Sequence, residues 1–236
     1  MMYKSLLIIT MTLSLVSCDP STLQKVLDTV NDAPLSSIDV SNGLKEALQL
    51  GVDNSVDFLS AENGYYKSAY KILLPDEANK VISKLANIPG FTKLEEEMIK
   101  KINRAAEDAA QKAGPIFLSA VRSITFDDAM DILLGNKDAA TQYLHKRTYN
   151  NLYGEFKPVL DNSLNKFGAL DLWTKAITKY NALPFVTDVN PDLSDHINSK
   201  ALVGLFDLIE KKEQGIRSDV SQRTSSLLQK VFAKQD

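Results

Sequence analysis

The chain of 236 residues contains very little of the residue types on which thiol, metal and phosphate chemistry depends. Its single cysteine, Cys18, excludes an intramolecular disulfide and a zinc site built on cysteine pairs. Its two histidines, His145 and His196, fall in different predicted helices, with no second ligand at a metal-binding spacing. Nucleophile-elbow, calcium-loop and glycine-rich phosphate-loop motifs are all missing. The sequence therefore predicts no metal or cofactor and assigns no catalytic residue.

An excess of basic residues is also missing. The chain has 27 lysines and arginines against 30 aspartates and glutamates, for a net charge of −3. A nucleic-acid-binding surface requires a strongly basic face, so we expect no nucleic-acid partner. Hydrophobic residues make up 44% and charged residues 24%, which is typical of a globular domain.

The N-terminus has the features of a bacterial lipoprotein precursor. Lys4 precedes an apolar stretch over 6–16, which is shorter than the about 20 residues that a membrane span needs. The stretch ends in Leu-Val-Ser-Cys at 15–18, which matches a lipobox. The thiol of Cys18 would take a diacylglyceryl group, and two or three acyl chains give stable anchoring. The alternative, a buried helix with an incidental cysteine, does not explain why the only cysteine stands at the lipobox position.

These features divide the chain into three parts: a signal peptide over 1–17, a lipid anchor and tether over 18–41, and a helical domain over 42–236. We expect an exported protein, lipid-anchored in the bacterial cell envelope, with its domain in the periplasm. Asp19 follows the anchor, and in some bacterial lineages an aspartate at this position retains lipoproteins at the inner membrane. The choice between inner and outer membrane stays open.

Helical periodicity dominates the domain, and no segment alternates cleanly at period two. Gly64-Tyr65-Tyr66 interrupts the pattern, and Thr92-x-x-Glu95 and Thr125-x-x-Asp128 are potential capping boxes. The terminal amphipathic segments need a partner surface, which favours a single domain. The sequence predicts an all-α, bundle-like fold of about nine or ten helices, over about 44–59, 75–87, 92–114, a segment beginning near 115, 125–134, 138–153, 156–167, 169–181, 195–216 and 219–233.

Several polar residues fall on apolar faces of these predicted helices. Arg147 lies near the middle of an apolar stripe on 138–153, and Glu213 lies within the apolar arc of 195–216. Asn103 and Glu107 form an i,i+4 pair beside small alanines. A buried charge must have a partner, because an unpaired one is very costly.

Two interpretations of these residues stay open. Internal salt bridges and hydrogen bonds would fix the register of the helices. Alternatively, Arg147, with Asn103, Glu107, Glu213 or Arg217, would line a polar pocket for a small anionic or amphipathic ligand.

Aromatic residues offer a weaker indication of function. Tyr65, Tyr66 and Tyr70 form a local cluster, which is either a contact surface or a set of half-buried packing residues. His145 lies off the apolar stripe of its helix, so we expect it to be exposed.

Six segments carry a resemblance to a known family: Gly43-Leu-Lys-Glu-Ala-Leu48, Asn103-Arg-Ala-Ala-Glu107, Asp138-Ala-Ala-Thr-Gln-Tyr143, Gly204-Leu-Phe206, Ile216-Arg-Ser-Asp219 and Leu227-Leu-Gln-Lys-Val-Phe232. Together they resemble an uncharacterised bacterial lipoprotein family known as domain of unknown function 4197, over about residues 40–233. The chain departs from the family pattern at Ile102, Val203 and Val220, where methionine, aspartate and proline are expected. The resemblance implies an α-helical, exported and mostly lipid-anchored protein, and it supplies no activity.

Three functions are compatible with these features. The leading hypothesis is a non-enzymatic, lipid-anchored domain that binds an envelope protein or a small ligand. An envelope hydrolase or lyase would use carboxylates such as Glu107 and Asp128. A structural or assembly lipoprotein would instead expose an apolar patch to another envelope protein.

Overall fold

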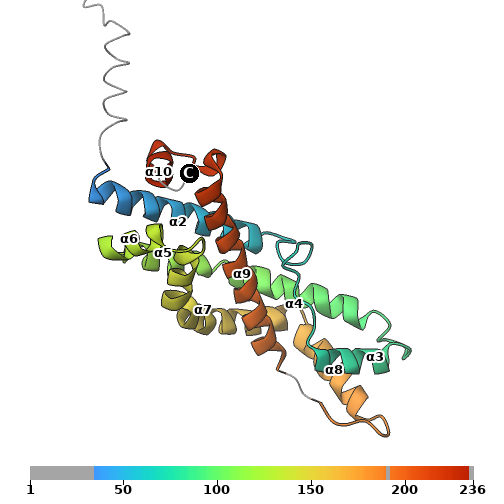
Figure 1. Ribbon diagram of the computed structural model, residues 1–236. Helices are drawn as coiled ribbons and strands as arrows, with labels where there is room; N and C mark the ends of the chain where they lie inside the picture. The colour runs from blue at the N-terminus through green and yellow to red at the C-terminus, as the bar shows by residue number, and fades with distance from the viewer. Residues whose placement is uncertain (1–34, 190–191, 234–236) are drawn as a thin grey trace, which may run out of the picture. The chain divides into compact units, whose positions relative to one another are not determined.

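The computed structural model describes residues 35–189 and 192–233, and within these ranges it is all-α, with no strand. The prediction of an all-α domain of about nine or ten helices is confirmed. Nine α-helices and one 3-10 turn, η1, make up the described part of the chain (Figure 1). Their bounds are α2 Ser37–Ser60, α3 Asp76–Leu85, α4 Leu94–Ala110, α5 Ala113–Arg122, α6 Phe126–Leu134, α7 Ala139–Lys166, α8 Ala169–Asn181, α9 Leu193–Ser218, η1 Val220–Gln222 and α10 Ser226–Phe232.

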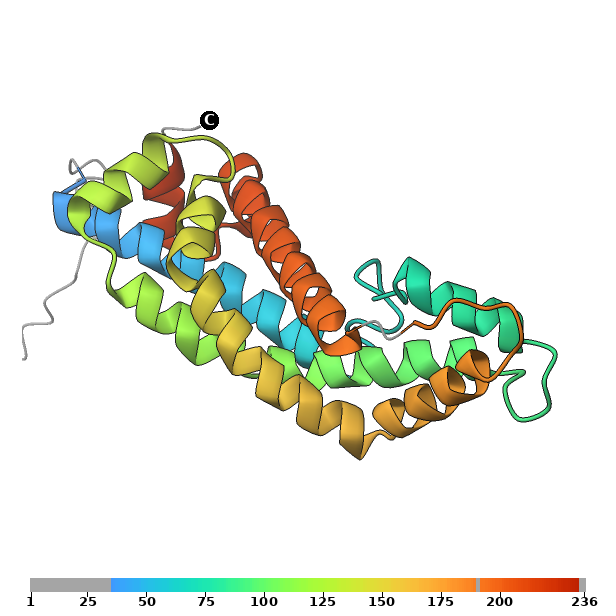
Figure 2. The same ribbon diagram turned by 90° about the horizontal axis from the view of Figure 1, so that it is seen from below.

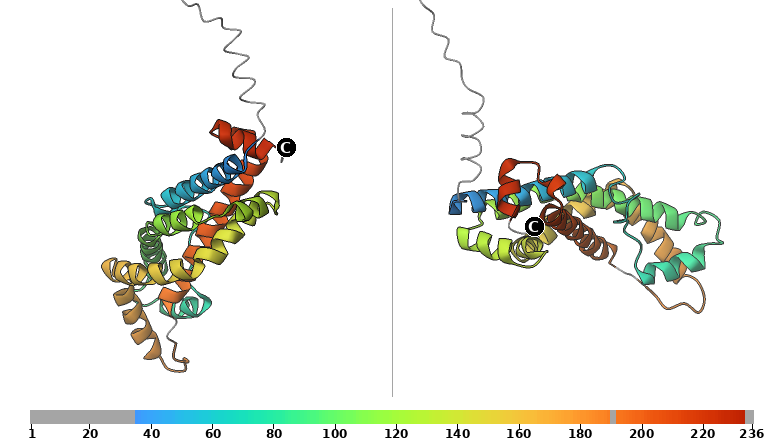
Figure 3. Two further views of the ribbon diagram at one scale, coloured as in Figure 1. Left: turned by 90° about the vertical axis from the view of Figure 1, so that its left-hand side faces the viewer. Right: turned by 45° about the horizontal axis from the view of Figure 1, so that its top comes forward.

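The long helices α2, α4, α7 and α9 pack against one another and carry the shorter ones. Helix α9 packs on α7, α2 and α4, while α3 packs on α8 (Figure 1). Helix α2 also contacts α5, α6 and α10, and both views of Figure 3 show α10 beside α2. In Figures 1 and 2, α3 and α8 lie together beyond the N-terminal end of α9, and α6, α10 and the beginning of α2 lie toward its other end. The predicted signal peptide and Cys18 lie outside the described residues.

Helix α2 begins earlier than the predicted tether allows. The predicted tether extends to Ser41, but α2 starts at Ser37. The N-cap is Ser36, whose Oγ accepts from Asp39 N at 3.1 Å, while the Asp39 carboxylate accepts from Ser36 N at 3.0 Å. This capping box satisfies two N–H groups of the first turn and moves the helix start upstream. The sequence prediction overlooked it because no long apolar run precedes Leu44.

The two predicted capping boxes have different outcomes. Thr125 and Asp128 form theirs, with Asp128 N donating to Thr125 Oγ1 at 3.1 Å, so this prediction is confirmed. The box predicted at Thr92 and Glu95 is wrong, because the N-cap of α4 is Lys93, which makes no side-chain capping bond. Instead of a capping box, a turn held by a backbone hydrogen bond precedes α4, with Leu94 N donating to Phe91 O at 3.0 Å.

Helix α7 is continuous, although the sequence predicts two helices separated near Gly154. Pro158 lies inside α7, where its ring presses on the carbonyl four residues earlier, that of Gly154. A stripe of buried side chains that includes Leu152, Phe156 and Leu160 runs through the predicted break. Packing of this stripe against the rest of the core outweighs the local preference of glycine and proline to end a helix.

The C-terminal prediction is also corrected. Instead of one helix over 219–233, the turn η1 precedes a short α10, whose N-cap Ser225 accepts from Leu228 N at 3.1 Å. Gly43 lets α10 approach α2 closely: a Cβ there would lie 2.6 Å from Val231 Cγ2. Gly43 is therefore a close packing contact between the first and last helices of the described chain.

Candidate functional site

The segment between α2 and α3 is held against the domain by a buried tyrosine. Tyr65 is fully buried, and its hydroxyl donates to Ala201 O in α9 at 2.8 Å. Burial raises the pKa of Tyr65, with the nearby Glu107 carboxylate adding to the effect. A Cβ added at Gly204 of α9 would lie only 3.3 Å from the rings of Tyr65 and Tyr70, so the segment lies directly on α9.

Asn103 holds the later part of the same segment in an extended conformation. Its Oδ1 accepts from Ile72 N at 2.8 Å, and its Nδ2 donates to Ile72 O at 2.8 Å. The amide side chain thereby satisfies both polar groups of one peptide residue, as a neighbouring strand would. Exposure alternates along this stretch: Lys71 and Leu73 face outward, and Ile72 and Leu74 are buried.

Glu107, one turn along α4, holds the beginning of the segment. Its Oε1 accepts from Tyr65 N at 3.2 Å and from Tyr66 N at 3.1 Å. Its Oε2 pairs with Arg104 Nη1 at 2.5 Å, and Arg104 also pairs with Glu62 at 2.9 Å. The buried carboxylate is thus both paired and hydrogen-bonded, which is the condition for burying a charge. Asn103 and Glu107 together position the segment from two points.

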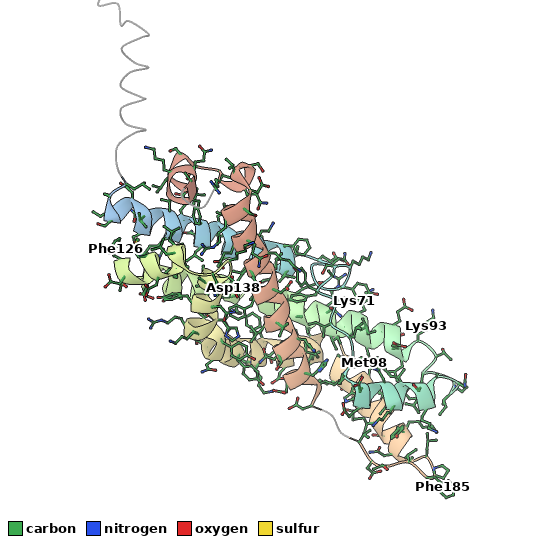
Figure 4. The ribbon with its side chains drawn as sticks, in the orientation of Figure 1. Lys71, Lys93, Met98, Phe126, Asp138 and Phe185 are labelled. Atoms are coloured by element: carbon green, nitrogen blue, oxygen red, sulfur yellow. The ribbon has the colours of Figure 1, made fainter. Side chains whose placement is uncertain are left out.

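A groove of about 810 Å³ lies between this segment and α9. One wall is built from 69–77, and the other is a stripe of α9 side chains. Lys71, labelled in Figure 4, belongs to the first wall. The stripe includes His196, Lys200, Val203, Gly204, Asp207 and Lys211.

The groove combines exposed apolar side chains with charges of both signs. Leu73 on one wall is 60% exposed and Val203 on the other is 62% exposed. Both lie at a groove that also contains Lys200 and, at the N-terminus of α3, the carboxylates of Asp76 and Glu77. Apolar contact area with a few placed polar groups is the composition of a binding site.

Hydrogen bonds between the walls fix the groove. His196 Nε2 lies 2.9 Å from Leu73 O, and because a carbonyl only accepts, this nitrogen carries the proton. Lys211 Nζ pairs with Asp207 at 2.6 Å and donates to Tyr70 Oη at 3.3 Å. Burial raises the pKa of Tyr70, and the hydrogen bond to Asp207 raises the pKa of Lys211.

A second buried network joins α9 to α6 and α7. Glu213 and Arg217 form an ion pair at 2.9 Å, with each side chain 7% exposed. The Glu213 carboxylate accepts from Ala140 N at 2.9 Å, from Thr141 N at 2.8 Å and from Thr141 Oγ1 at 2.8 Å. A carboxylate at these N–H groups complements the positive N-terminal end of α7.

Arg217 interacts with carbonyl groups at the C-terminal end of α6. It donates to Ile132 O at 2.8 Å and to Leu133 O at 3.2 Å, which are carbonyls of the last turn of α6, where a helix runs short of N–H donors. Arg223 in turn donates to Ile216 O and Arg217 O, both at 3.0 Å, at the end of α9. These charges therefore cap three helix ends in the interior.

Arg147 does not belong to either network, which corrects the prediction that it faces the core. It is exposed, and its guanidinium lies over the Tyr143 ring, 5.3 Å from the centroid. The buried face of α7 passes instead through Thr141 and Thr148. Their hydroxyls are bonded, Thr148 Oγ1 to Leu144 O at 2.6 Å, so these threonines pack as core residues.

The structure thus places the predicted site residues in two groups and at one surface position. Asn103 and Glu107 act together beneath the groove, and Glu213 and Arg217 act together between helix ends. The groove residues of α9 were missed by the sequence prediction. A regular spacing of lysine and apolar residues on one side of 196–211 was the available indication, but the opposite wall lies more than 100 positions away in the sequence.

The carboxylates proposed for an enzyme have separate tasks. Glu107 is bonded to Tyr65, Tyr66 and Arg104, and Asp128 caps α6. Hydrogen bonds from Thr125 lower the pKa of Asp128, which is the reverse of what a general acid requires. Within 35–189 and 192–233, no cluster of three potential metal ligands occurs, and none of these helices is long and apolar enough to cross a membrane.

His145 is exposed, as predicted, and stacks on Tyr149 with 4.8 Å between ring centroids. Of the predicted tyrosine cluster, Tyr65 is a core residue, while Tyr66 and Tyr70 are half-buried. Only Tyr70 contributes to the groove.

Comparison with known proteins identifies a family and nothing closer. The model of the family described as "Protein of unknown function (DUF4197)" matches residues 34–233. No curated protein and no solved structure matches the chain.

Proposed function

The chain belongs to the DUF4197 family of unknown function, and from that premise we propose that it is a lipid-anchored envelope protein whose groove binds a ligand or a partner segment. The observation that carries the binding role is the groove itself, about 810 Å³ between 69–77 and α9. Its size is in the range of about 300–1,000 Å³ that ligand pockets occupy.

The way the groove is built supports a binding role. Buried Asn103 holds Ile72 of one wall, and buried Glu107 holds the chain just before that wall at Tyr65 and Tyr66. His196 connects the wall to α9. A wall fixed in this way is preorganised, so binding does not have to order it. Leu73 and Val203 then offer apolar contact at the surface of a rigid scaffold.

The anchor is carried by the sequence alone. A lipobox ending at Cys18, a short apolar stretch before it and no further cysteine support lipid attachment at that residue. The described domain starts at residue 35, so the groove belongs to a domain attached to its anchor by a short tether.

The anchor is tested with Cys18→Ala. We expect this variant to lose fatty-acid labelling and to accumulate as the unprocessed precursor. Labelling and processing equal to those of the wild type would contradict the anchor.

The groove is tested by filling it. Val203 is largely exposed, so Val203→Trp occupies the groove without disturbing the core. Full-length protein purified from membranes and examined by native mass spectrometry should retain an additional mass that Val203→Trp loses. Lys175→Trp, on an exposed position of α8, is the matched control and should retain it. Equal retention by Val203→Trp, or no retained mass in any protein, would contradict the groove as the binding site.

A further inference from the structure

Helix α6 carries a wider apolar arc than the domain covers. Its buried residues are Ala129, Ile132 and Leu133. Phe126 and Leu134 are 43% and 76% exposed. Because residues four apart advance by about 40° on a helical wheel, Phe126, Leu134 and the half-buried Met130 between them share one stripe about 80° wide.

This stripe lies beside the beginning of α2. Helix α6 packs against α2, and Lys45 Nζ donates to Arg122 O at 3.4 Å just before α6 starts. Phe126 is labelled in Figure 4 next to the first turn of α2, where Ile38 is 69% exposed. Phe185 is labelled at the opposite end of the described helices. The exposed apolar side chains of α6 and of the first turn of α2 thus gather where the chain enters the domain.

Covalent geometry brings this end within reach of a lipid on Cys18. Ser36 follows Cys18 by 18 residue steps, 36 minus 18, which at full extension span at most about 65 Å. The tether joins the domain at the first turn of α2, so this end of the domain has the shortest covalent path to the anchor. A short tether also raises the effective concentration of lipid at this end, so weak apolar contacts suffice.

We propose that the exposed stripe of α6, Phe126, Met130 and Leu134, together with Ile38, contacts the lipid surface to which Cys18 anchors the chain. This inference rests on the proposed lipid anchor and adds an orientation: the α6 end faces the membrane and the Phe185 end faces away. The contact is interfacial, since α6 has nine residues and cannot span a bilayer.

The contact is apolar in character. The polar face of α6 carries Asp127, Asp128 and Asp131, which anionic lipid would repel. Attraction therefore comes from burying phenylalanine, methionine and leucine at the boundary between headgroups and acyl chains. High salt should consequently leave the contact unchanged.

Spin labelling tests the orientation, and the lone cysteine makes it feasible. Since lipid occupies the thiol of Cys18, Met130→Cys, Leu134→Cys or Phe185→Cys would each provide one free thiol for a nitroxide. The full-length lipidated protein is placed in vesicles of phosphatidylethanolamine and phosphatidylglycerol. We expect labels at positions 130 and 134 to be more accessible to oxygen than to a water-soluble nickel chelate, at low and high salt, and the label at 185 to show the reverse.

Three results would overturn the inference, and they are distinguishable. A nickel preference at all three positions, in protein that carries lipid on Cys18 and floats with the vesicles, leaves the anchor intact and removes the orientation. Labels at 130 and 134 that are immobile and shielded from both reagents would show a protein contact there, from a second copy or another partner. Protein without lipid on Cys18 would remove the anchor and the orientation together.

Discussion

The buried pair of Glu213 and Arg217 allows the sharpest prediction about stability. Arg217→Met keeps an apolar stem of similar length and removes the donors to Ile132 O, to Leu133 O and to Glu213. Removing one partner of a buried ion pair typically costs about 3–5 kcal/mol. Glu213 keeps three donors at the start of α7, which places the expected loss near the lower limit, at about 3 kcal/mol. For a domain of this size, that loss corresponds to a decrease in Tm of about 10 °C.

Urea unfolding followed by circular dichroism measures the difference. Arg147→Met is the matched control, because Arg147 is exposed and stacks on Tyr143. It should change the free energy of unfolding by less than about 0.5 kcal/mol. The reasoning is refuted if Arg217→Met is as stable as the control, or if Arg147→Met is the more destabilised of the two.

Three further predictions follow from individual contacts. Gly43→Ala should destabilise the fold despite the better helix propensity of alanine, because the new Cβ meets Val231 at 2.6 Å. In urea unfolding, Gly43→Ala should cost less in a Val231→Ala background than in the wild type; an equal cost in both backgrounds would contradict the contact. Asp128→Asn should be less stable than the wild type at pH 7, because a carboxylate with a lowered pKa stabilises the fold only when it is ionised. The difference in stability should vanish as the pH falls through the folded pKa of Asp128, which lies below its ordinary 3.8; a difference independent of pH would argue against this. Tyr65→Phe should cost about 1–2 kcal/mol, because it removes the hydroxyl that donates to Ala201 O. Burial raises the pKa of Tyr65, so the wild type but not the variant should lose this contribution to stability as the pH rises above 10.0, the ordinary tyrosine value; parallel alkaline denaturation of the two would contradict it.

The helices themselves could be predicted from the sequence wherever local chemistry determines them. Thr125-x-x-Asp128 forms the capping box that its spacing predicts. The continuous α7 could not be predicted in this way, because Gly154 and Pro158 are local helix breakers and the packing that overrides them involves distant helices.

Burial of polar residues was predictable only where hydrophobic neighbours define the face of a helix. Asn103, Glu107 and Glu213 fall among apolar residues in the sequence and are buried. Arg147 was misplaced because Thr148 looks polar in the sequence, whereas its hydroxyl is bonded to Leu144 O and its methyl group packs inside. The apolar stripe of α7 is rotated accordingly, and the arginine turns to solvent.

The pairing of the two groove walls could not be predicted from the sequence. The walls come from 69–77 and from 196–211 of α9, and only the fold brings them together. No local pattern indicates that Asn103 satisfies the peptide of Ile72 and thereby fixes the first wall. A sequence indicates which side chains are exposed more readily than which exposed side chains face one another.

Photo-crosslinking in living cells tests the binding role of the groove most directly. A photoreactive amino acid is placed at Leu73, at Val203 and, as a control, at the exposed Lys175 on α8. We predict one discrete adduct shared by positions 73 and 203 and absent at 175. No adduct at either groove position, or the same adduct at all three positions, would contradict a binding site between 69–77 and α9.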